Sequence, residues 1–256
     1  MKIVTSRENP AFKQLRALGQ GRERDMALLD GIHLCEVWSQ RGWPVQLCAF
    51  AEDAIDRPEV ADLLEIAHGL GAEMLGLSRT LMSQVSQLDS PAPIVYVVAP
   101  RRAAPASLAG RDAIVLDGVQ DPGNVGTMLR TAAAAGVEVA IAGPGTAGFW
   151  SPKVLRAGMG AQMLLDCIEV DDLAAALDEL ALPVIGTVVR DATPLYDFNL
   201  AAPRAWVFGN EGRGLSAALD ARLDERCTIP HHDGIESLNV AAAAAVCLFE
   251  MLRQRR

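Results

Sequence analysis

Three separated segments in the second half of the chain combine glycine, asparagine, serine and acidic residues. They are DPGNVGTMLRTA (121–132), GNEGRGLS (209–216) and IPHHDGIESLNVA (229–241). Each follows a short apolar run typical of a strand and leads toward a helical pattern. Open α/β sheets bind ligands at the carboxyl ends of their strands, because loops and helix starts there present free backbone N–H groups. The sequence therefore predicts one polar pocket built from three distant segments.

Arg130 is the residue of the first segment best suited to chemistry. It lies six residues after Asn124, nearly two helical turns on, and its side chain can lean back toward the helix N-terminus. Gly123 and Gly126 leave space around the loop. Backbone N–H groups at a helix start, together with a forked guanidinium, suit a phosphate or a ribose. The alternative is structural, with Asn124 as the helix N-cap and Arg130 as an ordinary exposed residue.

The other two segments are informative in different ways. The second holds three glycines in six residues, but it has neither the Gly-x-Gly-x-x-Gly spacing nor a Lys-Ser/Thr pair. It therefore favours neither dinucleotide nor triphosphate binding. In the third, Ser237 and Asn239 stand at the start of the last expected helix, where they would serve equally well as caps. We expect His231 and His232 to face solvent or the turn rather than to accept a proton.

Together and in this order, the three segments resemble the signature motifs of the SpoU-type (TrmH-like) RNA 2′-O-ribose methyltransferases of the SPOUT superfamily. The resemblance covers residues 112–256, and residues 1–99 are similar, more loosely, to the substrate-binding domain of many ribosomal-RNA members. It implies a deep trefoil knot, a homodimer, S-adenosylmethionine as cofactor and methylation of an RNA ribose 2′-hydroxyl. The extra N-terminal domain favours ribosomal over transfer RNA. The alternative from another class is a non-catalytic RNA-binding or ribosome-assembly protein.

The resemblance also implies roles for residues at positions that match the motifs. The implied catalytic set is Arg130, Asn124, Glu211, Ser237 and Asn239. The implied cofactor-binding set is Gly209, Ile229, Leu238, Thr187 and Asn210. The candidate cations for substrate phosphates are Lys13, Arg16, Lys153 and Arg156. No metal-ligand cluster is visible in the sequence, and displacement from a sulfonium requires no metal.

The family assigns the role of base to the arginine that Arg130 matches. A guanidinium pKa above about 12 makes a neutral arginine costly. Arg130 can instead hold the neighbouring phosphate and stabilise the alkoxide, while the proton leaves through water. The chain also departs from the family pattern at Gly158, where serine is common, and at residues 231–233, where a hydrophobic residue often follows the proline.

The elements that must position these residues form two expected α/β domains, residues 1–99 and 112–256, joined by a linker at 100–111 with two prolines and three arginines. In the first domain, strand-like runs and helical patterns alternate. The strand-like runs are 26–30, 45–50, 73–77 and 94–98, and the helical patterns are 10–18, 32–41, 58–68 and 79–88. In the second, near-continuous apolar runs predict a buried, mostly parallel sheet with helices on both faces. The runs are 113–117, 137–142, 162–165, 183–188, 205–208 and 227–229, and the helices 124–135, 153–158, 171–181, 216–222 and 236–254.

The charge distribution bears on an RNA partner. The net charge of −9 argues against a nucleic acid, because phosphate affinity needs local positive charge. However, residues 1–24 hold six cations and two anions, whereas residues 52–73 hold seven anions and one arginine. A basic N-terminal region can therefore meet RNA while an acidic helix faces solvent. The alternative is a solvated charged helix without a partner.

The remaining composition narrows the class of protein. The chain has no signal-peptide pattern at its start, and its longest apolar run, residues 240–249, is too short to span a bilayer. We expect a soluble, cytoplasmic protein that acts on neither membrane nor DNA. Five cysteines without a close pair argue against a disulfide framework and a Cys-x-x-Cys metal site. Alanine runs at 132–135 and 241–245 indicate two tightly packed helices.

Overall fold

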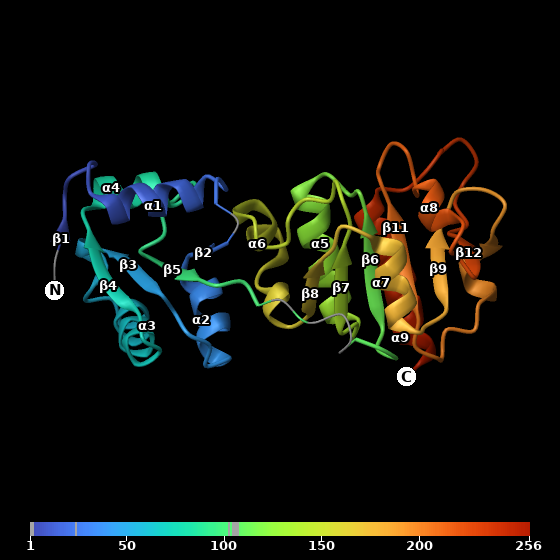
Figure 1. Ribbon diagram of the computed structural model, residues 1–256, viewed down its shortest axis with the longest axis horizontal. Coiled ribbons are helices and arrows are strands. Elements are labelled where there is room, and N and C mark those ends of the chain that lie inside the picture. The colour runs from blue at the N-terminus through green and yellow to red at the C-terminus, as the bar shows by residue number, and fades with distance from the viewer. Residues whose placement is uncertain (1–2, 24, 102, 104–107) are drawn as a thin grey trace. The chain divides into compact units, whose positions relative to one another are not determined.

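The computed structural model describes residues 3–23, 25–101, 103 and 108–256, which form two units (Figure 1). The first unit comprises Met1–Pro100 and Trp150–Met163, and the second comprises Arg101–Phe149 and Leu164–Arg256. The segment Trp150–Met163, expected within the catalytic domain, packs as part of the first unit. Residues 102 and 104–107 of the expected linker lie outside the described residues.

The first unit contains a five-stranded mixed sheet in the order β1-β4-β3-β5-β2. β4 pairs in parallel with β1 and β3, and β5 pairs in antiparallel fashion with β3 and β2. The strands are β1 (Ile3–Val4), β2 (Ala27–Asp30), β3 (Leu47–Ala51), β4 (Glu73–Leu77) and β5 (Ile94–Val98). The helices are α1 (Pro10–Gly19), α2 (Ile32–Gln40), α3 (Pro58–Gly69), α4 (Arg79–Val85) and α6 (Pro152–Gly158).

The second unit contains a seven-stranded sheet in the order β10-β12-β9-β11-β6-β7-β8, with parallel pairing throughout. The strands are β6 (Ala113–Asp117), β7 (Val139–Ala142), β8 (Asp166–Glu169), β9 (Val184–Thr187), β10 (Thr193–Pro194), β11 (Ala205–Gly209) and β12 (Glu225–Thr228). The helices are α5 (Pro122–Ala134), α7 (Leu173–Leu180), α8 (Ala217–Asp220) and α9 (Val240–Gln254). The expected parallel α/β architecture is thereby confirmed.

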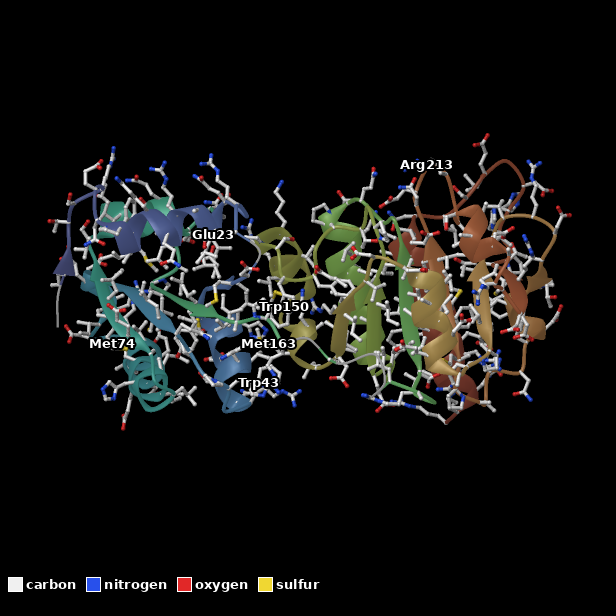
Figure 2. The ribbon with its side chains drawn as sticks, viewed as in Figure 1. Glu23, Trp43, Met74, Trp150, Met163 and Arg213 are labelled. Carbon is white, nitrogen blue, oxygen red and sulfur yellow. The ribbon has the colours of Figure 1, made fainter. Side chains whose placement is uncertain are left out.

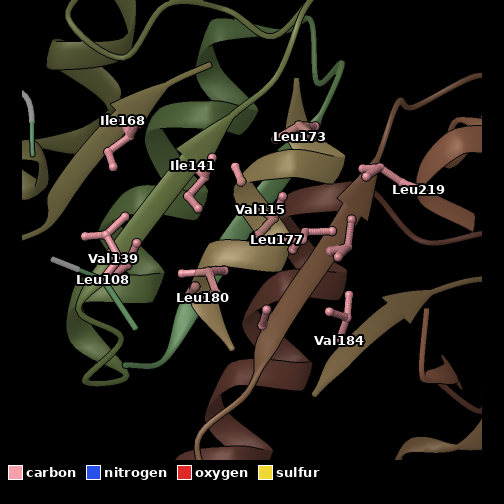
Figure 3. Close-up of a cluster of buried hydrophobic side chains, with 14 residues drawn as sticks. Leu108, Val115, Val139, Ile141, Ile168, Leu173, Leu177, Leu180, Val184 and Leu219 are labelled. Carbon is pink, nitrogen blue, oxygen red and sulfur yellow. The ribbon is translucent and has the colours of Figure 1, made fainter. Parts of the chain in front are cut away.

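Alternating side chains of this sheet pack on opposite faces, as the pleat requires. On one face, Val115 and Ile141 of the central strands are buried with Leu173, Leu177 and Leu180 of α7 (Figure 3). On the other, α5 and α9 pack against each other, and α9 contacts β11 (Figure 1). Helices on both faces bury the central strands, so the exposed carboxyl edge of the sheet is left for function.

Two expected elements differ from the structure. The strand expected at 162–165 is wrong: Ala161–Met163 forms a 3-10 helix, and the strand is β8. β8 has only two buried side chains, so its apolar signal in the sequence is weak. Its pairing with β7 and the hydrogen bond from Arg111 to Asp166 (2.6 Å) hold these residues in the sheet. Also, the last helix begins at Val240 rather than 236, because Asn239 caps it.

Within the described ranges, none of the helices is both long and apolar enough to cross a bilayer.

Candidate active site

The three glycine- and asparagine-rich segments follow β6, β11 and β12, at the carboxyl-terminal edge of the parallel sheet. β6 and β11 are neighbours, and β9 lies between β11 and β12. The chain runs from β6 to β7 on one side, while β11 lies on the other side of β6. Such a reversal of strand order opens a crevice at the carboxyl ends of the strands. The topology therefore brings the three segments to one place.

A chain of hydrogen bonds joins the three segments. Asn124 Nδ2 donates to Glu211 Oε1 at 3.1 Å, and Asn239 Nδ2 donates to Asn124 Oδ1 at 3.0 Å. The Glu211 carboxylate also accepts the backbone N–H groups of Gln120 (3.3 Å) and Asp121 (3.4 Å). Burial raises the pKa of Glu211, but the donors Asn124, Gln120 and Asp121 outweigh it and lower the pKa overall. Glu211 is therefore ionised at neutral pH.

Helix starts fix the two asparagines. Asp121 is the N-cap of α5, and its Oδ1 accepts the Asn124 N–H at 2.9 Å. The interpretation of Asn124 as the N-cap is therefore wrong; Asn124 lies in the first turn, and its side chain reaches Glu211 and Asn239. Asn239 is the N-cap of α9, and its Oδ1 accepts the N–H of Ala241 at 2.9 Å. Its Nδ2 is thereby directed to Asn124.

The segment after β11 is a tight loop organised by Asn210. Its Nδ2 donates to the Gly118 carbonyl at 2.8 Å, and its Oδ1 accepts the N–H of Arg213 at 3.0 Å. Asn210 and Gly214 also exchange two backbone hydrogen bonds of 2.9 Å. A Cβ at Gly209 would lie 2.4 Å from the Gly214 carbonyl carbon, so only glycine fits there. The loop that presents Glu211 is consequently rigid.

A cavity of about 570 Å³ opens beside this network, within the size range of small-molecule sites. Its walls include residues from β9, from the loop after β11 and from the segment after β12. All the expected cofactor-binding residues line it, namely Thr187, Gly209, Asn210, Ile229 and Leu238. Glu211, Ser237 and Asn239 of the expected catalytic set also line it, and Asn124 bonds to two of these three.

Arg130 is placed differently from the rest of the expected catalytic set. It is not among the residues that line the cavity, and it lies on the exposed face of α5. Among the described residues, its guanidinium has neither a hydrogen-bond nor an ion-pair partner. The cation is therefore available to a molecule outside this chain.

The expected phosphate-contacting cations belong to the first unit. Lys13 and Arg16 lie on the exposed side of α1, and Lys153 and Arg156 lie on the exposed side of α6. Their contact with substrate stays a prediction.

Several cavity residues were not expected from the sequence. Val188 and Val189 line the cavity after β9, and Arg213 lines it from the loop after β11. Val188 and Val189 carry no polar or glycine-rich signal in the sequence. Only their position at the end of a strand could have indicated that they line a cavity. His231 also lines the cavity, with its Nδ1 2.7 Å from the Ile229 carbonyl oxygen. His231 and His232 are both exposed, as expected.

The model of the SpoU rRNA Methylase family matches residues 112–249. The chain belongs to this family. It is 34% identical to an uncharacterized tRNA/rRNA methyltransferase of Synechocystis sp., over 98% of this chain and 94% of that protein. It is 30% identical to the 23S rRNA (guanosine(2553)-2′-O)-methyltransferase RlmP of Bacillus subtilis, over 98% of this chain and 99% of that protein. The AdoMet-bound rRNA methyltransferase of Sinorhizobium meliloti has a similar structure, with a TM-score of 0.88, 26% identity, and coverage of 98% and 97% of the two chains.

These findings confirm the expected family and fold class. They also confirm the class of enzyme, an RNA 2′-O-methyltransferase with S-adenosylmethionine as its methyl donor. Among the described residues, no group of three or more His, Cys, Asp or Glu side chains is placed to hold a metal ion.

Proposed function

We propose that this SpoU-family enzyme methylates a ribose 2′-hydroxyl of ribosomal RNA. The observation that carries the proposal is the chain of hydrogen bonds from Asn239 through Asn124 to Glu211 beside a cavity of about 570 Å³. The Bacillus subtilis relative, which matches nearly the full chain, is named for a guanosine of 23S rRNA. Ribosomal RNA as substrate would place the enzyme in the cytoplasm.

The residues of the cavity fit S-adenosylmethionine. Ile229, Leu238 and Val189 offer apolar surface for an adenine ring, and backbone groups of the rigid loop after β11 lie beside them. The ionised Glu211 carboxylate places a negative charge in the cavity, which favours a sulfonium. Bound there, the cofactor supplies an electrophilic methyl group.

The chain's own residues would mainly orient the ribose. Glu211 is held by hydrogen-bond donors that together lower its pKa, so it is a weak base and serves as an acceptor for a hydroxyl. Ser237 lines the same wall and adds a hydroxyl group that can donate or accept. Fixing the nucleophile in line with the methyl group supplies a large part of the rate of a displacement.

Arg130 would stabilise charge rather than accept the proton. Its pKa above about 12 makes a neutral guanidinium costly at neutral pH. An exposed, unpaired guanidinium suits the phosphate beside the target ribose and the developing alkoxide. The proton would then leave through water.

We also infer that two copies of the chain form a homodimer through α9 and the neighbouring α5. α9 leaves Phe249 48% exposed, and Ala242 and Val246 are at least partly exposed at helical spacing on the same side. Such an apolar stripe is typical of a protein–protein interface. The trefoil knot that the family resemblance implies, with the C-terminal segment threaded through an earlier loop, also stays a prediction.

The experiment that tests the function is transfer of a labelled methyl group from S-adenosylmethionine to unmodified 23S ribosomal RNA, with transfer RNA as comparison. Mass spectrometry of nuclease digests would then locate the 2′-O-methylated nucleotide. We expect one ribose methylation in ribosomal RNA. Methylation of transfer RNA alone would overturn the proposed substrate, and RNA binding without methyl transfer would favour a ribosome-assembly protein.

A further inference from the structure

The arginines of the second unit fall into two groups. Between residues 108 and 255 of this unit, most form ion pairs with carboxylates, namely Arg111, Arg204, Arg222, Arg226, Arg253 and Arg255. In the same described stretch, the arginines without a carboxylate partner are Arg130, Arg190 and Arg213. Each of these three follows or belongs to a segment at the carboxyl edge of the sheet. Of these three arginines, Arg213 is the one that lines the cavity beside Glu211.

Arg213 has the most informative position of the three. It lies at the crest of the loop after β11, as Figure 2 shows, and its side chain is exposed. It lines the cavity of about 570 Å³ that Glu211 also lines. It also lines a second cavity of about 520 Å³, on the side of the loop that faces α7 and α8. Arg213 therefore contributes to the walls of both cavities.

The acids around the second cavity do not neutralise Arg213. Asp117, Asp171 and Asp172 line that cavity, yet none lies within ion-pair distance of the guanidinium. Asp117 accepts the Ser216 N–H at 2.6 Å, and Asp172 caps α7. Two of the three carboxylates are therefore engaged with backbone groups, and the guanidinium is left for another anion.

The backbone of Arg213 is held in place before any ligand binds. Its N–H donates to Asn210 Oδ1 at 3.0 Å, and Asn210 itself is anchored to Gly118. The next residue, Gly214, is locked to Asn210 by two backbone hydrogen bonds of 2.9 Å. A fixed backbone lowers the entropic cost of ordering the side chain on a ligand.

We propose that Arg213 binds a phosphate of the RNA backbone near the target ribose, distinct from the phosphate assigned to Arg130, and thereby strengthens RNA binding. The inference rests on the proposed function. An approaching phosphate is repelled by the ionised Glu211, which lies two residues before Arg213 in the same loop. It is also repelled by the net negative charge of the protein. An unpaired guanidinium on the rim of the cavity offsets that repulsion, and its planar fork matches two phosphate oxygens.

The test compares Arg213→Ala and Arg213→Lys with Arg222→Ala. Arg222 is exposed and pairs with the exposed Asp178, so its loss changes the net charge equally without touching the cavity. The probe is unmodified 23S ribosomal RNA made by in vitro transcription. The measurements are its Kd as a function of salt, kcat and KM for methyl transfer, the Kd of S-adenosylmethionine and the melting temperature.

We expect Arg213→Ala to raise Kd and KM for the RNA about tenfold and to reduce the slope of log Kd against log salt by about 0.7. kcat should change little, because the phosphate contact is made in ground and transition states alike. Arg213→Lys should restore the salt slope and part of the affinity, and Arg222→Ala should match the parent. Binding of S-adenosylmethionine and the melting temperature should be unchanged in all variants.

Several results would overturn the inference. Unchanged RNA affinity and salt slope in Arg213→Ala would exclude the phosphate contact. Weaker S-adenosylmethionine binding with normal RNA binding would show that Arg213 binds the cofactor's carboxylate instead. Equal losses of RNA affinity in Arg213→Ala and Arg222→Ala would show that the effect comes from the change in net charge rather than from a contact at Arg213. If the parent bound RNA through Arg213 but transferred no methyl group, the proposed function would fail while the contact stood.

Discussion

Asn124 and Asn239 are 115 residues apart in the chain, and the amide group of Asn239 donates to that of Asn124 at 3.0 Å. Each side chain is fixed by a helix start: Asn239 caps α9, and Asn124 follows the cap of α5. Because α5 and α9 also pack against each other, the bond reports on the docking of the two helices as well as on the site. The polar network is therefore preorganised, and its parts should fail together when one is removed.

Asn124→Ala removes the residue that links Glu211 to Asn239. We expect kcat/KM for methyl transfer to fall at least about 10²-fold, because the misplaced carboxylate and amide no longer orient the ribose. The loss should appear mainly in kcat. Asn124→Asp serves as a matched variant of the same size; it sets a second carboxylate against Glu211 and should be at least as impaired. Near-parent kcat in either variant would show that the network is only structural.

Glu211 gives the protein a pH-dependent term in its stability. Its pKa in the folded protein lies below the ordinary value of 4.5. A lowered folded-state pKa contributes stability above the unfolded-state pKa, and this contribution is lost as pH falls through the folded-state value. Urea unfolding should therefore show the parent more stable than Glu211→Gln at pH 7, with the gap narrowing in acid. A gap that is the same at pH 7 and pH 3 would show that the carboxylate charge contributes nothing.

Gly209→Ala tests the rigidity of the loop that carries Glu211. The new Cβ would meet the backbone of Gly214 at 2.4 Å, so the loop must open. We expect a loss of about 1–3 kcal/mol in the free energy of unfolding and weaker cofactor binding. Gly212→Ala is the matched control, because its Cβ would lie 3.7 Å from Asn210 Oδ1, an ordinary contact. Equal stability of the two variants would contradict the close approach.

Arg130→Ala separates chemistry from cofactor binding. Arg130 is exposed, has no partner among the described residues and does not line the cavity. We expect methyl transfer to be abolished while calorimetry shows parent-like affinity for S-adenosylmethionine and a parent-like melting temperature. Arg130→Lys should recover little activity, because an ammonium lacks the planar fork. Turnover near the parent rate in Arg130→Ala would remove Arg130 from the active centre.

The sequence was sufficient to indicate the site segments because each combines local signals that do not depend on the rest of the fold. The glycines around Glu211 indicate a turn, and Ser237 and Asn239 are expected at the start of the last helix, which Asn239 caps. The helix of the first segment is expected at 124–135, two residues later than the start that Asp121 caps. Apolar runs bounded by such signals located β6, β9, β11 and β12 to within a few residues. The parallel sheet then followed from alternation of strands and helices.

The long-range arrangement could not be derived in the same way. Nothing local places β11 beside β6 or β9 between β11 and β12, yet this order decides that Val189 and Arg213 share a cavity with Leu238. The error at 162–165 has a similar origin. The apolar residues there resemble a strand, whereas β8 is selected by pairing with β7 and by the bond from Arg111 to Asp166. Packing of Trp150–Met163 with the first unit is likewise a tertiary property.

Phe249→Asp tests the proposed homodimer. The Phe249 ring is 48% exposed on α9, within the apolar stripe that includes Ala242 and Val246. We expect light scattering to give the parent twice the chain mass of 27.2 kDa and the variant a single chain mass, because a carboxylate in the interface would be buried without a partner. Leu164→Asp, at a side chain 57% exposed outside α9, should remain dimeric. A parent that is monomeric at micromolar concentration, or a dimeric Phe249→Asp, would refute this interface.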